Sequence, residues 1–148
     1  DGKLNSNLGS LMTAAGQFND SQVDVLVHGA DCPAQIESAS KYPGISSILV
    51  AQDPKLQNSY GDSVARLIKS LVESKGYDKV VAASTSFGKD VMPRAGGLLD
   101  VQAITDVIEI LGDSKFKRPV YAGNAVATVS TSDKIKLITV RSTNFNKI

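Results

Sequence analysis

The stretch that decides the fold is KVVAASTSFGK, residues 79–89. Its first five residues are mostly β-branched or small, which is typical of a strand that is buried on both faces. Three hydroxyl residues and a glycine lie in the segment that follows, and the pattern beyond them predicts a helix over about residues 89–99. A buried strand that leads through a short polar loop into a helix is the repeating unit of an α/β domain.

The same alternation extends toward the N-terminus. Hydrophobic periodicity and turn residues predict helices over 8–18 and 33–40, strands over 23–27 and 45–50, and a helix that carries Val64, Leu67, Ile68, Leu71 and Val72 and ends at Gly76. Strands that are apolar on both faces and separated by helices indicate a mostly parallel sheet. We therefore expect a three-layer α/β fold, with helices on both faces of the sheet.

The last third of the chain has a different spacing of apolar segments. Short apolar runs at 103–110, 118–121, 125–129 and 135–140 are separated by turn residues, without room for a helix between them. This spacing predicts antiparallel hairpins that extend the sheet toward the C-terminus. The polar residues 141–148 fit no element of the pattern, and we expect them to lead out of the domain.

The order of elements at the N-terminus is unusual, because such domains normally open with a strand. This chain opens with turn residues 1–5 and a helix. We therefore expect that a first, central strand of the sheet lies outside the sequence.

Composition narrows the function classes. The chain has 148 residues, 42% of them hydrophobic, and its 16 basic and 15 acidic side chains leave a net charge of +1. One ordinary domain is expected at this length. The near balance of charge argues against binding to nucleic acid or to an anionic membrane, and no apolar run approaches the roughly 20 residues of a membrane span. A single Cys and a single His exclude an internal disulfide and the common zinc sites.

The loop 84–89 is the best candidate for a ligand site, because it joins the carboxyl end of a strand to a helix N-terminus. Ser84, Thr85, Gly88 and Lys89 are weak candidates for holding a phosphate. The loop is not a P-loop, because Ala83 stands at the first glycine of that motif. A turn that caps the helix N-terminus explains the same residues equally well.

Candidates for catalysis are isolated from one another in the sequence. His28 follows a strand and could serve a triad or simply pack there, and Cys32 could be activated by a helix terminus or be a small core residue. Asp100 and Asp106 could form an acid–base pair, or Asp106 could lie on a solvated strand face; Arg94 is best explained by a structural ion pair. The sequence predicts no catalytic residues and no metal ligands, so we expect a domain that binds, supports or assembles.

A resemblance to a known family extends over the whole chain. The tracts that carry it are Ser86-Phe87-Gly88-Lys89, Pro93-Arg94, Leu99-Asp100-Val101, Ile104-Thr105-Asp106-Val107, residues 118–125 (RPVYAGNA), and Thr139-Val140-Arg141-Ser142-Thr143 with Phe145. In this order and spacing they closely resemble the alpha subunit of electron transfer flavoprotein. The resemblance implies a single N-terminal, adenine-nucleotide-hydrolase-like domain over residues 1–148, without the C-terminal domain that binds FAD. It also implies an apolar strand before Asp1.

The resemblance further implies a supporting role. In such a heterodimer, FAD accepts electrons from acyl-CoA dehydrogenases of fatty acid β-oxidation, and a membrane quinone oxidoreductase receives them; AMP is expected in the beta subunit only. Phe87, Lys89, Arg94 and Asn124 are then candidates for interface or architecture. The implied location is the mitochondrial matrix, or the cytoplasm of a bacterium.

Two alternatives remain open from the sequence. The first is a free-standing adenine-nucleotide-binding domain that uses the loop 84–89, and the second is a hydrolase built on His28.

Overall fold

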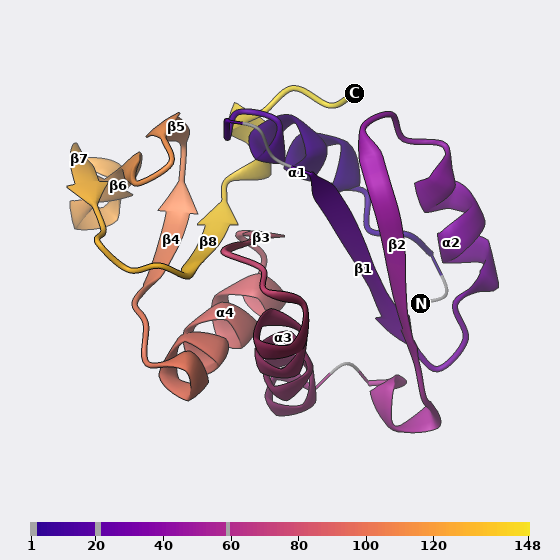
Figure 1. Cartoon of the computed structure of the whole chain (residues 1–148). Helices are drawn as coiled ribbons and strands as arrows, with labels where there is room; N and C mark the ends of the chain where they lie inside the picture. The colour runs from indigo at the N-terminus through magenta and orange to yellow at the C-terminus, as the bar shows by residue number, and fades with distance from the viewer. Residues whose placement is uncertain (1–2, 20–21, 59) are drawn as a thin grey trace.

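The computed structural model describes residues 3–19, 22–58 and 60–148, so Asp1 and Gly2 of the expected opening turn lie outside the described part. The first two thirds of the chain alternate helices and strands, as expected (Figure 1). The elements are α1 (Leu8–Ala15), β1 (Val23–Gly29), α2 (Pro33–Ser40), β2 (Ile45–Gln52), α3 (Gly61–Lys75), β3 (Lys79–Ala83) and α4 (Ser86–Leu99).

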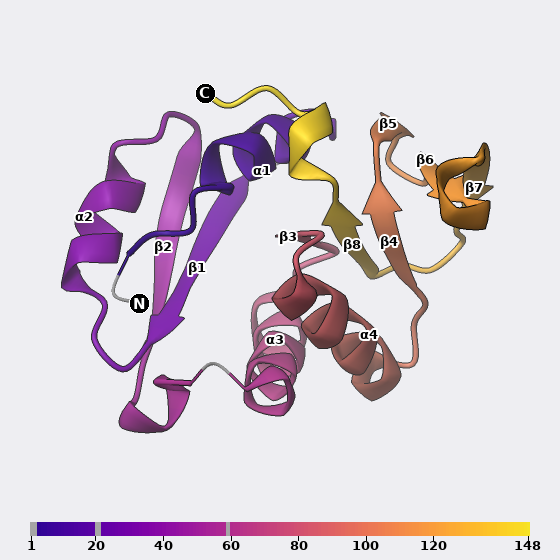
Figure 2. The ribbon, with the colours of Figure 1, turned by 180° about the vertical axis from the view of Figure 1, so that it is seen from behind.

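The last third holds five strands. They are β4 (Ala103–Val107), β5 (Glu109–Gly112), β6 (Lys115–Val120), β7 (Ala125–Ser130) and β8 (Lys136–Val140). The described strands form three sheets: a parallel pair β1-β2, a parallel sheet in the order β3-β8-β4, and an antiparallel sheet β5-β6-β7. From behind, the pair β1-β2 with α2 and the sheet β5-β6-β7 stand at opposite sides of the molecule (Figure 2).

The prediction of a mostly parallel α/β fold with antiparallel strands near the C-terminus is confirmed, but hairpins do not extend the main sheet. β8 is parallel to both β3 and β4 and lies between them. The error came from reading short connections as pairing between successive strands. The partners of β8 lie far back in the sequence, and the whole meander β5-β6-β7 serves as the crossover connection from β4 to β8.

The core packs on both faces of this central sheet. Leu137 of β8 lies in one cluster with Val64 of α3 and Met92 of α4, and its neighbour Ile138 lies in another with Ala14 of α1 and Phe116 of β6. Successive residues of a strand point to opposite faces, so β8 is buried from both sides. Four of its five residues are buried, which matches its apolar sequence.

The C-terminal segment does not lead away from the domain as expected. Phe145 is buried, and its carbonyl oxygen accepts a hydrogen bond from the Ser10 hydroxyl at 2.9 Å. The carbonyl of Asn146 accepts another from the Thr13 hydroxyl at 2.6 Å. This segment is polar except for a few residues, and one of these, the aromatic Phe145, anchors it against α1.

Candidate functional site

The loop between β3 and α4 is held by hydrogen bonds of its own residues. The Thr85 hydroxyl accepts a hydrogen bond from the Gly88 amide at 3.2 Å, which makes Thr85 the N-cap of α4. The Ser84 hydroxyl donates to the Thr139 hydroxyl of β8 at 2.9 Å. α4 begins at Ser86, three residues earlier than expected, because this cap lies further toward the strand.

Gly88 is required by a close approach of two backbones. A Cβ atom at this position would lie 2.0 Å from the carbonyl oxygen of Ala83. Of the four phosphate-loop candidates, Ser84, Thr85 and Gly88 thus have structural tasks inside the domain. Lys89 is exposed, and within the described residues no hydrogen bond or salt bridge of its ammonium group is found.

A charged network lies at the carboxyl ends of β4 and β8. Arg141 binds both carboxylate oxygens of Asp106 through two guanidinium nitrogens. The Arg141 guanidinium holds the pKa of the Asp106 carboxyl below its usual range, and the charges of Lys89 and Arg118 act in the same direction. Asp106 also has φ +59°, and its amide donates to the Thr139 hydroxyl at 2.9 Å.

This network separates the two aspartates that could have formed an acid–base pair. Asp100 ends α4 in a left-handed conformation, at the start of the connection to β4, whereas Asp106 lies near the opposite end of that strand. The partner of Asp106 is the cation Arg141. The sequence did not predict this pair or the hydrogen bonds of the buried Thr139, because contacts between residues more than 30 positions apart leave no local signal.

His28 and Phe87 form a second contact at the same end of the sheet. Their rings stack with centroids 5.7 Å apart and planes inclined by 27°. The His28 Nδ1 is buried and has no hydrogen-bond partner among the described residues, and burial lowers the pKa of the imidazole. Cys32 is a buried free thiol at the start of α2. Packing inside the fold therefore explains the positions of both His28 and Cys32.

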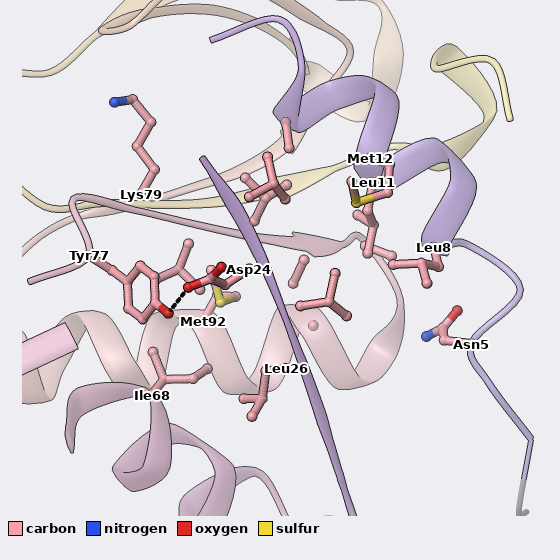
Figure 3. Close-up of a pocket in the computed structure, with 18 of the residues that line it drawn as sticks. Asn5, Leu8, Leu11, Met12, Asp24, Leu26, Ile68, Tyr77, Lys79 and Met92 are labelled. Atoms are coloured by element: carbon pink, nitrogen blue, oxygen red, sulfur yellow. Dashed lines mark hydrogen bonds between the residues drawn. The ribbon is translucent and has the colours of Figure 1, made fainter. Parts of the chain in front are cut away.

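A cavity of about 460 Å³ lies between β1 and β3. The hydroxyl of Tyr77, just before β3, donates to the Asp24 carboxylate of β1 at 2.5 Å across one end of this cavity (Figure 3). Burial, together with the hydrogen bond to Asp24 and its charge, raises the pKa of Tyr77 to about 12. Apolar side chains of α1, α3 and α4 complete the lining.

The interface candidates are all exposed. Phe87, Lys89 and Arg94 lie on α4, and Asn124 follows the short helix η2 (Tyr121–Gly123) at the far end of β6. The Arg94 guanidinium donates to the Asp90 carboxylate at 2.7 Å, one helical turn earlier. This contact confirms the structural ion pair that the sequence favoured.

Metal-binding clusters and membrane-spanning helices are both missing from the described part of the chain. Residues 3–19, 22–58 and 60–148 contain no group of three or more His, Cys, Asp or Glu side chains that could bind a metal ion. Across the same residues, the helices are too short or too polar to span a bilayer.

Comparison with known proteins gives a consistent result. The family model for the electron transfer flavoprotein domain matches residues 1–148. The electron transfer flavoprotein subunit alpha of Pseudomonas aeruginosa is 41% identical over 135 residues, which cover 91% of this chain and 43% of that protein. The mitochondrial alpha subunits of Dictyostelium discoideum and Arabidopsis thaliana are 34% and 38% identical, over 97% and 92% of this chain and 42% and 39% of their own lengths. The chain spans about two-fifths of the length of these relatives, and it belongs to the electron transfer flavoprotein family as the N-terminal domain of an alpha subunit.

Proposed function

We propose that this domain is the scaffold on which an electron transfer flavoprotein alpha subunit assembles with its beta subunit. The observation that carries the proposal is the extent of the similarity, which includes nine-tenths of this chain but under half of the relative from Pseudomonas aeruginosa. A cofactor-binding domain in the remaining length would leave to this part the tasks of support and assembly.

The FAD of the complete subunit is placed outside this domain in our proposal. The cavity between β1 and β3 does not fit it, because strand edges and apolar helix side chains form most of the lining. Its polar lining includes Asp24 and Tyr77, which are hydrogen-bonded to each other. A diphosphate needs cations or free amide donors, and a carboxylate at this position would repel it.

The complete heterodimer would act as an electron carrier. It would accept electrons on FAD from acyl-CoA dehydrogenases of fatty acid β-oxidation and pass them to a quinone oxidoreductase of the membrane. The beta subunit would hold AMP. The mitochondrial names of the relatives from Dictyostelium discoideum and Arabidopsis thaliana favour the mitochondrial matrix for a eukaryotic source, and the bacterial cytoplasm is the counterpart for a prokaryotic one.

The exposed face of α4 is our candidate for the contact with the beta subunit or the FAD domain. Phe87 is 38% exposed although it is a large apolar residue, and Leu98 on the same helix is exposed to the same extent. Lys89 is an exposed cation of this helix, whereas the charge of Arg94 is balanced by its ion pair with Asp90. Asn124, on the other side of the domain, would have an architectural role next to β7.

Co-elution tests the proposal directly. The chain is mixed with a folded beta subunit from the same source, and size-exclusion chromatography should show a joint peak. Arg94→Glu should reduce the joint peak, whereas Arg66→Glu on α3 should not. The two arginines are matched, because each forms an exposed ion pair with an aspartate one turn earlier. Separate elution of two folded partners would contradict the scaffold role.

Calorimetry separates this proposal from the nucleotide-binding alternative. The chain is titrated with AMP and with ATP, and we expect no heat of binding. Micromolar binding that is lost in Lys89→Ala would instead favour an adenine-nucleotide sensor that uses the loop 84–89. If the rate of hydrolysis is the same for the parent chain and for His28→Ala, the hydrolase alternative is excluded.

A further inference from the structure

Three basic side chains from separate elements lie around the carboxylate of Asp106. Arg141 follows β8 directly and binds this carboxylate through two guanidinium nitrogens. Arg118 of β6 donates to the carbonyl oxygen of Thr105, the residue before Asp106, at 2.8 Å. Lys89 lies near the start of α4, and its charge, like those of the two arginines, lowers the pKa of the Asp106 carboxyl. We refer to Lys89, Arg118 and Arg141 as the basic cluster.

The fold holds the carboxylate at the centre of this cluster in a fixed position. Asp106 has φ +59°, a left-handed backbone conformation that side chains other than glycine rarely adopt. Its amide donates to the Thr139 hydroxyl at 2.9 Å, and the Arg141 amide donates to the Val107 carbonyl at 2.8 Å. Backbone strain of this kind is concentrated at sites where a group has to be held in one place. The position of the Arg141 guanidinium is therefore set by the backbone on both sides of the ion pair.

The charges of the basic cluster do not balance. Three cations act on one carboxylate, so two positive charges are left over. Asp90, the neighbour of Lys89 in the chain, is already paired with Arg94 at 2.7 Å. The chain as a whole has a net charge of only +1. The excess of positive charge is therefore a local property of this part of the surface.

The basic cluster also has hydrogen-bond donors that the domain does not use. Arg141 employs Nε and one terminal nitrogen for Asp106, and Arg118 employs the same two positions for Thr105. Within the described residues, no partner is found for the second terminal nitrogen of either arginine or for the Lys89 ammonium group. Lys89 is exposed, and the Arg141 side chain is 45% exposed. Charged donors that face water can bind an anion that another molecule brings.

The hydrogen bonds at the start of α4 favour protein carboxylates over a phosphate as this anion. A phosphate at this end of the sheet would use the amide and hydroxyl donors of the loop before the helix. The Gly88 amide already donates to the Thr85 hydroxyl, and the Ser84 hydroxyl donates to Thr139. The unused donors belong instead to long side chains on separate elements. Carboxylates spaced along a peptide segment fit such donors, and planar guanidinium groups bind them with two hydrogen bonds each.

We propose that the basic cluster receives an acidic segment of the beta subunit when the two subunits assemble. This inference rests on the proposed scaffold role and names the charge that the partner brings to it. Lys89 belongs to α4, the helix whose exposed face is proposed for the contact, so the cluster extends that surface across the carboxyl ends of β4 and β8. Opposite charges on two partners raise the rate at which they associate, and this effect weakens as salt is added.

The test measures association rates with a folded beta subunit from the same source, by biolayer interferometry. Lys89→Glu should slow association about tenfold at about 50 mM NaCl, and the difference from the parent chain should shrink at about 300 mM, because salt screens exposed charges. Lys89→Arg should retain the parent rate. The matched control is Lys55→Glu, because Lys55 is also exposed and no ion pair of its ammonium group is found among the described residues. Circular dichroism checks that each variant is folded.

Each other outcome counts against the proposal in a distinct way. If Lys89→Glu associates as fast as the parent chain, or if Lys55→Glu is slowed equally, the acidic contact is overturned while the scaffold role stands. If the parent chain does not associate at all, both are overturned. Calorimetry with inorganic phosphate should show no binding to the chain. Micromolar phosphate binding that is lost in Lys89→Gln would overturn the acidic contact in favour of a phosphate site.

Discussion

The two edges of β3 place the same five residues in opposite situations. Along one edge the strand pairs in register with β8, from Lys79 opposite Lys136 to Ala83 opposite Val140. Along the other edge it borders the cavity of about 460 Å³. The comparison teaches that an apolar strand sequence specifies burial but does not specify how many neighbours the strand has.

The largest expected effect contrasts a leucine of β8, on the paired side of β3, with a leucine of β1, on the cavity side. Leu137 of β8 is fully buried, and Leu137→Ala should lower the free energy of unfolding by about 2–5 kcal/mol. Leu26 of β1 lines the cavity and is half-buried, so Leu26→Ala should cost only about 1 kcal/mol. Urea denaturation measures both. Equal losses of unfolding free energy in the two variants would mean that β1 beside the cavity is packed as tightly as β8.

The second prediction concerns the attachment of α4 to the end of β3. Gly88→Ala forces a methyl group against the carbonyl of Ala83 and should cost about 1–3 kcal/mol. Gly97 lies in the same helix, and a methyl group added there would have no neighbouring atom within 4 Å, so Gly97→Ala should stabilise the chain by about 0.5–1 kcal/mol. Thermal unfolding compares the two variants with the parent chain, and a Gly88→Ala variant as stable as the parent would contradict the close approach.

The third prediction concerns the hydroxyl that ties the paired strands together. Thr139→Val leaves the Asp106 amide and the Ser84 hydroxyl without their acceptor, and should cost about 1–2 kcal/mol. Thr139→Ser retains the hydroxyl and is the matched control. In the valine variant the Asp106 amide should also exchange its hydrogen faster. If the valine variant were as stable as the serine variant, the network would contribute nothing to stability.

The smallest expected effect is a pH dependence of stability that comes from a residue of the cavity lining. His28, which lines the cavity, is the sole histidine of the sequence. Burial lowers its pKa, so the unfolded state binds the proton more readily. The stabilising contribution is therefore present above the unfolded pKa of about 6.5 and is lost as the pH falls below it. Denaturation between pH 7.5 and pH 5 measures this loss, and His28→Gln should remove it.

Sequence reasoning located the elements better than their partners. Local signals placed Gly76 at the end of α3, where it has φ +74°, and Pro33 at the start of α2. The position of β8 was missed, because strand pairing between residues 33 to 57 positions apart leaves no local signature. The strand-to-helix loop at Ser84 was found, whereas the Asp106–Arg141 pair depends on two strand ends that only the folded sheet brings together.

The position of β8 has a consequence for synthesis on the ribosome. Among the described strands of this domain, the one that joins β3 to β4 is made last, at residues 136–140. Until it leaves the exit tunnel, β3 and β4 both have exposed edges, and the nascent chain is most vulnerable to aggregation. A translation pause before residue 136 should therefore increase the need for chaperones more than a pause after β2.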